Sequence, residues 1–184
     1  MSTTVDAASF DALHELKIRG FARSLGTRQR DLLEHDLVVE TPVGFMLTET
    51  GDEVHSTHLR DERSRLDLAE LEAIYERFLV LNREFKLLCS RWHTADAGVR
   101  ADLAFEADDI MDRVRPILRR TAKTLPRFDR HLVNLATARD RFEHGYQEWL
   151  LRPDIDSIHT VWMHVHEDFI QTLGRNREDE EGAG

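Results

Sequence analysis

The sequence contains one cysteine, no long apolar run and no basic N-terminal region followed by an apolar segment. Cys89 has no partner for an intramolecular disulfide or a CxxC pair, which excludes a disulfide-stabilised scaffold. Because Cys89 lies in an apolar helical pattern, we interpret it as a small buried apolar residue. A membrane-spanning helix needs about 20 apolar residues, and a signal peptide needs a basic and then an apolar region. We therefore expect a cytoplasmic protein without a membrane partner.

Glycine is also scarce, with nine residues and no glycine-rich loop that could hold a phosphate. The GxSxG pattern of a nucleophilic serine is missing as well. Two acidic pairs, Asp108–Asp109 and Asp154-x-Asp156, are explained by an exposed helix face and a helix cap. The sequence therefore predicts that the protein is not an enzyme and uses no cofactor.

Positive charge is in deficit, since the net charge is -10 over 184 residues. This value excludes a strongly basic nucleic-acid-binding protein as a description of the whole chain, but it leaves a local basic patch open. Apolar residues make up 41% of the chain and recur with helical periodicity, so a packed core is feasible. The length suits one large domain or two small ones.

The N-terminal part predicts a small unit over residues 9–62 after a flexible tail over residues 1–8. Ser9 is a candidate cap for the first helix, and a short helix is expected over about 28–35. Two apolar runs near 37–41 and 44–48 flank turn residues and predict a β-hairpin. A helix follows, with Thr48 or Thr50 as its cap.

Residues 63–174 predict an antiparallel four-helix bundle, followed by a disordered acidic tail over 175–184. Its clearest pattern is a heptad seam with apolar steps of three and four residues: Leu71, Ile74, Phe78, Leu81, Phe85, Leu88 and Trp92. We expect Pro116 to kink or restart the next helix. The pattern from Phe128 to Trp149 predicts another helix, and Gly174 ends the last one. The fold class is therefore mainly α, with one β-hairpin and a helical bundle.

The hairpin and its flanks, residues 34–58, carry a pattern written LV…G…LT..G. Its members are Leu37, Val38, Gly44, Phe45, Leu47, Thr48 and Gly51. This segment resembles the wing of MarR- or PadR-type winged-helix regulators, over about a seventh of the chain. Residues 70–177 resemble the helical region of bacterial regulator-like proteins with a winged-helix-like N-terminus. The resemblance implies an abbreviated winged-helix unit that binds DNA.

A basic cluster precedes the wing, because the segment from Lys17 to Arg30 contains no acidic residue. Arginine and glutamine are common donors to phosphates and base edges, and the candidate DNA-binding residues are Arg23, Arg28, Gln29 and Arg30. The alternative is that these are ordinary solvated side chains. Two features depart from an ordinary winged helix. Only two convincing helices fit before the hairpin, and the hairpin itself is flanked by Glu40, Glu49, Asp52 and Glu53.

The helical region offers candidates for a ligand pocket, because aromatic residues form rigid apolar walls with polar tips. These are Asn82, Trp92, Tyr146, Trp149, His159, Trp162 and His166; the alternative is that they form the core or, for Asn82, are solvated. Four histidines, His131, His144, His159 and His166, could in principle hold a metal. The spacing lacks HExxH or the ExxH pairs of a di-iron bundle, so we expect no metal.

Two hypotheses follow for function. The first is a transcriptional regulator with a winged-helix DNA-binding unit and a helical domain for dimerisation or ligand sensing. Its expected partners are DNA, a small-molecule effector and a second copy joined through the heptad seam. The alternative is a ligand-binding or protein-interaction module that binds no DNA and retains a degenerate winged helix.

Overall fold

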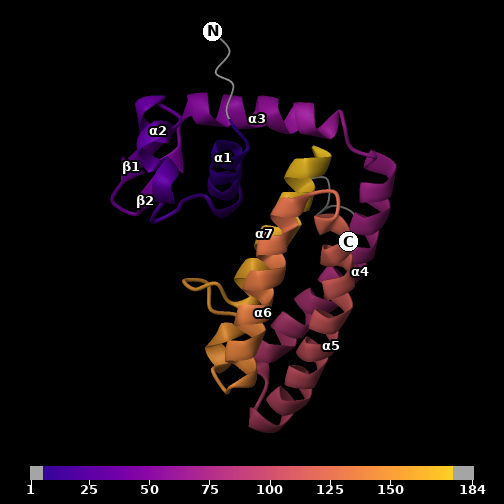
Figure 1. The fold of residues 1–184 in the computed structure, drawn as a ribbon. Helices are drawn as coiled ribbons and strands as arrows, with labels where there is room; N and C mark the ends of the chain where they lie inside the picture. Colours follow the sequence, from indigo (N-terminus) through magenta and orange to yellow (C-terminus); the bar gives the residue numbers. More distant parts are fainter. Residues whose placement is uncertain (1–5, 176–184) are drawn as a thin grey trace. The chain divides into compact units, whose positions relative to one another are not determined.

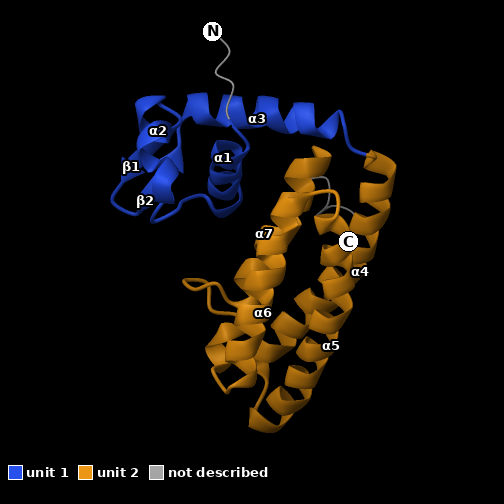
Figure 2. Ribbon diagram, viewed as in Figure 1, with its two compact units in different colours: residues 1–66 blue, residues 67–184 orange. Residues whose placement is uncertain are grey.

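The computed structural model describes residues 6–175, and over this range the chain is mainly helical with one two-stranded antiparallel hairpin. It divides into two compact units, residues 1–66 and 67–184 (Figure 2). The boundary expected after residue 62 falls close to this division. The expected tails lie mostly outside the described residues, but Ala7 and Ala8 belong to the first helix. No helix within the described range combines the length and the apolar character needed to span a membrane.

Unit 1 is built from short elements, with bounds as follows (Figure 1): α1 (Ala7–Arg19), η1 (Gly26–Arg28), α2 (Gln29–Glu34), β1 (Val38–Thr41), β2 (Gly44–Leu47) and α3 (Glu49–Arg63). The cap expected at Ser9 is wrong: Asp6 is the N-cap of α1, and its carboxylate accepts from the Ser9 amide at 2.8 Å. An aspartate stabilises a helix start because it accepts from free amides and faces the positive end of the helix dipole. Thr48 caps α3, as its position predicts.

The hairpin of unit 1 pairs Val38 with Leu47 and Val39 with Met46. Ala22 adds a single pairing on the other side of β2, because it exchanges two backbone hydrogen bonds with Phe45 at 3.0 and 2.7 Å. Gly44 lies at φ +137°, and a Cβ there would stand 2.5 Å from the Ala22 carbonyl oxygen. Glycine is required at this turn by both its backbone conformation and the close approach of Ala22.

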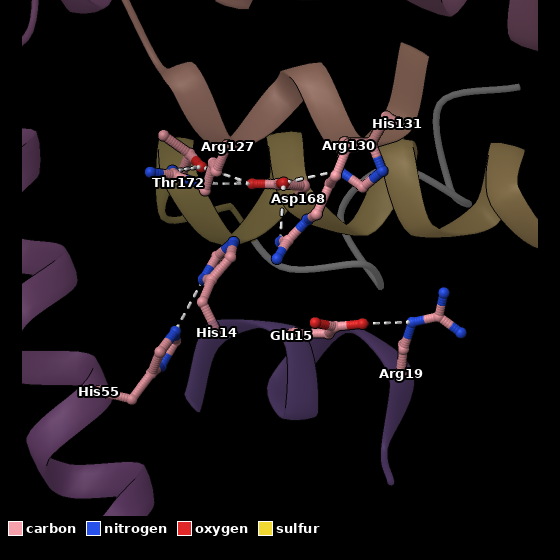
Figure 3. A network of polar contacts seen from close by, with 9 residues as sticks. All are labelled: His14, Glu15, Arg19, His55, Arg127, Arg130, His131, Asp168 and Thr172. Carbon is pink, nitrogen blue, oxygen red and sulfur yellow. Dashed lines mark hydrogen bonds and ion pairs between the residues drawn. The ribbon is translucent and has the colours of Figure 1, made fainter. Parts of the chain in front are cut away.

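The core of unit 1 lies between α1, α2 and the hairpin. It consists of Leu13, Leu16, Leu32, Leu37, Val38 and Phe45. Beside this core, His14 Nδ1 of α1 lies 2.8 Å from His55 Nε2 of α3, and both imidazoles are buried (Figure 3). Unit 1 thus has a small apolar centre that fixes the hairpin against the two helices around it.

The elements of unit 2 have the following bounds: α4 (Leu68–Thr94), α5 (Ala97–Ala122), η2 (Pro126–Phe128), α6 (Asp129–Glu143), η3 (Gln147–Trp149) and α7 (Ile158–Leu173). α4 packs on α5, α5 on α6, α6 on α7, and α7 on α4. Of the kink or restart expected at Pro116, the restart does not occur, because α5 continues through this residue. The helix expected up to Trp149 is also shorter than predicted, because α6 ends at Glu143 and Gly145 then has φ +93°.

The heptad seam of α4 is buried inside unit 2, where every one of its seven residues is at most 6% exposed. Phe85 stacks on Trp162 of α7 with ring centroids 4.5 Å apart. Asn82 is buried rather than solvated, and its side-chain oxygen accepts from the Trp162 indole nitrogen at 2.8 Å. A dimer through an exposed seam, as the sequence suggested, is therefore wrong: the chain covers the seam with its own helices.

Candidate nucleic-acid interface

The surface before the wing is formed by the segment from Ala22 to α2. Ala22 pairs with β2, so the chain enters this segment from the sheet and returns to the sheet at β1. Between these points lies one helical stretch, residues 26–34, where a helix-turn-helix has two helices. α2 itself has six residues and is thus about 9 Å long. The described residues contain two helical stretches before the hairpin, which agrees with the sequence.

The four candidate DNA-binding side chains have different environments. Arg23 is exposed and makes no ion pair within the part of the chain that the structure describes. The Arg30 side chain is 89% exposed and lies only loosely against Glu34, with a Nε–Oε1 distance of 3.7 Å. Gln29, at the start of α2, is half-buried. Arg23 and Arg30 are therefore the two candidates that can reach an external partner freely.

Arg28 is engaged within unit 1, because its Nη1 lies 2.9 Å from Oδ2 of Asp6. The pKa of Asp6 is lowered, first by the hydrogen bond from the Ser9 amide and further by the positive charge of Arg28. An arginine that already faces a carboxylate has less charge to offer a phosphate. Arg28 is thus better placed to hold the start of α1 against the start of α2 than to contact DNA.

The remaining surface near the wing is acidic or apolar. The exposed side of α2 carries Asp31 and Glu34 as well as Arg30. On the hairpin, Val39, Val43 and Met46 are 45%, 60% and 40% exposed, which makes the outer face of the wing apolar. The basic surface available to a phosphate is therefore small and centred on Arg23 and Arg30.

Gly51 explains the LT..G part of the wing pattern. The Thr48 hydroxyl donates to the Asp36 carbonyl at 2.5 Å and accepts from the Gly51 amide at 2.9 Å. A Cβ at Gly51 would stand 1.9 Å from the Leu37 carbonyl oxygen, so the first turn of α3 rests directly on the backbone that leads into β1. This contact fixes the hairpin to α3 and leaves no room for a side chain.

The seven candidates for a ligand pocket mostly fill the core of unit 2. His166 lies with Nε2 2.9 Å from the Tyr75 hydroxyl, and Trp162 is bonded to Asn82. Trp92 packs edge-on against Phe142. Tyr146 is 50% exposed in the segment after α6, and Trp149 is half-buried in η3. Asn82, Trp162 and His166 are therefore packed residues of the core, and a groove of unit 2 between α5 and α6 is lined by other side chains.

The histidines considered for a metal site are held in separate surroundings. His131 bonds Asp168, while His144 is exposed at the end of α6. Burial lowers the pKa of His159, and the nearby His93 lowers it further. Across residues 6–175, no three histidine, cysteine, aspartate or glutamate side chains are placed to hold a metal ion.

A buried charged network was missed by the sequence interpretation, which treated the last helix as a set of histidines (Figure 3). Asp168 of α7 is fully buried, and its Oδ1 accepts from Arg127 Nε at 3.1 Å. Its Oδ2 lies 2.8 Å from His131 Nε2 and 3.6 Å from Arg130 Nη2. Arg127 also donates to Thr172 Oγ1 at 2.7 Å. The network joins η2 and α6 to α7, and removal of one partner would leave a buried charge uncompensated.

A weak signal for this network exists, because Arg127, Arg130 and His131 follow one helical face just after the Leu125–Pro126 stop. The partner Asp168 lies 37 residues beyond His131, so no local pattern connects them. Ala22 was missed for the same reason, because a single residue that pairs with β2 has no periodic signature.

Comparisons of the chain with protein-family models, curated proteins and solved structures give no match.

Proposed function

We propose that the protein is a non-catalytic cytoplasmic transcriptional regulator. In this proposal, unit 1 is an abbreviated winged helix that contacts DNA. Unit 2 is an antiparallel four-helix bundle that serves dimerisation or ligand sensing. The observation that carries the proposal is the pairing of Ala22 with Phe45. This pairing adds a third short segment to the hairpin, as in a winged helix, where the residues after the first helix pair with the wing. α2 then occupies the position directly before the wing.

The exposed surface around α2 favours contact with DNA phosphates rather than with bases. α2 is too short to place many side chains along a groove, and Arg28 is paired with Asp6. The exposed charges of Arg23 and Arg30 suit phosphate oxygens on either side of a groove. Contacts to phosphates position a protein without reading sequence. We therefore expect weak binding that depends strongly on salt and has little sequence preference of its own.

The double substitution Arg23→Ala, Arg30→Ala tests this contact surface. Each phosphate contact adds about 0.9 to the slope of log K against log salt concentration. We expect the double variant to lower that slope by about 2 and to weaken binding by about tenfold or more at low salt. The measurement is fluorescence anisotropy with duplexes obtained by selection from random DNA, repeated over a range of salt concentrations.

Arg83→Ala is the matched control, because Arg83 is an exposed arginine of α4 without an ion pair in the described chain. It removes one positive charge from unit 2 and should leave the slope unchanged. If the unsubstituted protein binds no selected duplex above background, the DNA-binding proposal is wrong. If it binds and the Arg23, Arg30 variant binds equally well, the contact surface is wrong.

The exposed wing favours a second candidate function, in which unit 1 binds another protein. Val39, Val43 and Met46 form an apolar surface, and exposed apolar side chains of this kind are typical of protein contacts. A photo-crosslinking amino acid at Val43 should then give discrete protein adducts in living cells. The same amino acid at the exposed Thr57 of α3 should give none. Equal labelling at both positions would contradict this function.

A further inference from the structure

A groove runs between α5 and α6 on the surface of unit 2, with a volume of about 370 Å³. We call it the α5–α6 groove. Its floor and walls are apolar and include Met111, Val114, Leu118, Leu132, Val133 and Ala136. Val133 is 63% exposed, so part of this apolar surface faces solvent rather than the core. An apolar groove of this size is a candidate for a binding surface.

One end of the groove is basic. Arg115 and Arg119 of α5 line it near the connection between α5 and α6. Both side chains are exposed, and within residues 6–175 neither makes a hydrogen bond or an ion pair. The pKa of Asp112 is lowered first by Arg139 and also by the charge of Arg115, so Arg115 lies near that carboxyl. Both guanidinium groups are nevertheless exposed to a partner that lies along the groove.

The other end is acidic. Asp140 and Glu143 of α6 line it, and α6 runs antiparallel to α5 across the short connection. At this end Arg139 bonds Asp112 of α5 and Glu143 of α6, each at 2.6 Å, and faces Asp108 as well. A single arginine thus pairs with three carboxylates, while the fourth, Asp140, lies 3.6 Å from His144 Nδ1. A negative charge therefore remains at this end.

The arrangement of charge identifies the partner. We propose that the α5–α6 groove is the surface through which two copies of this chain associate, with a two-fold axis perpendicular to the helices. That axis reverses the second copy along the groove. Arg115 and Arg119 of each copy then face the acidic end of the other, while the apolar residues meet in the middle. An isologous interface has to be self-complementary in this way.

Other occupants fit the charges less well. A small anion with an apolar tail would meet Arg115 and Arg119 but would also lie against Asp140 and Glu143. A uniformly charged partner would be repelled at one end for the same reason. The heptad seam of α4 cannot serve as the interface, because it is buried within unit 2.

This inference names the surface for the dimerisation part of the proposed function, and it rests on that part of the proposal. The two tests remain separate, because association is measured here without DNA. Analytical ultracentrifugation of the full chain over a concentration series should give a dimer. The variant Arg115→Glu, Arg119→Glu should raise the dissociation constant by about 100-fold, since like charges would then face each other at both ends.

A second variant, Asp140→Lys with Glu143→Lys, reverses the other end of the groove and should weaken self-association similarly. Mixing the two variants should restore a dimer, because every facing pair is then of opposite sign. The mixture distinguishes charge repulsion from misfolding, since recovery of the dimer requires that both variants are folded. Arg77→Glu with Arg83→Glu is the control, because it reverses two exposed charges of α4 outside the groove and should leave association unchanged.

Three outcomes would overturn the inference. The unsubstituted chain could sediment as a monomer at all concentrations. Both charge-reversal variants could dimerise with the same affinity as the unsubstituted chain, which would place the interface elsewhere. Native mass spectrometry could show a monomer with a small molecule whose binding is lost in the Arg115, Arg119 variant, which would identify the groove as a ligand site.

Discussion

Replacing Asp168 with alanine is expected to destabilise unit 2 by about 3–5 kcal/mol, the usual cost of leaving a buried charge without its partner. The Arg127 side chain is only 5% exposed and cannot turn to solvent without opening the contact between η2 and α7. His131 loses its acceptor in the same variant. The measurement is urea unfolding followed by tryptophan fluorescence, and the midpoint should fall strongly.

Asp154→Ala is the matched control for this experiment. Asp154 also pairs with an arginine, since Arg152 Nε lies 2.6 Å away, but the pair is solvent-exposed. Solvent screens such pairs, so the control should leave the midpoint almost unchanged. The variant Asp168→Leu with Arg127→Met removes both charges and should recover part of the lost stability. Equal midpoints for Asp168→Ala and the unsubstituted protein would show that the buried network contributes nothing.

Gly51→Ala is the second substitution with a large expected effect, this time in unit 1. A methyl group at this position would overlap the Leu37 carbonyl oxygen, so α3 must separate from the chain that enters β1. We expect a cost of about 3 kcal/mol or more, at the upper end for overpacking of a rigid backbone contact. Hydrogen exchange should detect it as faster exchange of the Phe45 amide, which bonds the Ala22 carbonyl.

Gly98→Ala provides the comparison, because Gly98 also lies in the first turn of a helix, after the N-cap Asp96. The nearest atom to a Cβ there is Asp96 Oδ1 at 3.5 Å, an ordinary contact. Alanine favours a helix over glycine by about 1 kcal/mol, so this variant should be neutral or slightly stabilising. If both glycine variants behaved alike, the close approach at Leu37 would not explain Gly51.

Local patterns predicted the elements of this fold well. The two apolar runs around Pro42 and Gly44 gave the hairpin, and Gly174 ends the last helix in a left-handed conformation. The steps of three and four residues identified the buried face of α4. These features depend on interactions within one element or one turn, so their signature lies in consecutive residues.

Features that depend on distant contacts were not predicted. The α4 seam could have faced either the same chain or a second copy. The packing of α7 on α4 decides this, and the periodicity of α4 alone does not show it. The engagement of Arg28 depends on Asp6, which the sequence placed in a flexible tail. For the candidate interface, the sequence indicated only the segment before the hairpin, and the structure then separated the exposed Arg23 and Arg30 from Arg28 and Gln29.

The division into two units has a spectroscopic consequence. All three tryptophans and both tyrosines lie after residue 66, so unit 1 contributes no signal to tyrosine or tryptophan fluorescence. Trp162, buried and bonded to Asn82, is a sensitive reporter of unit 2. Circular dichroism reports the helices of both units. A melting curve that differs between the two methods would therefore reveal separate unfolding of the units without any label.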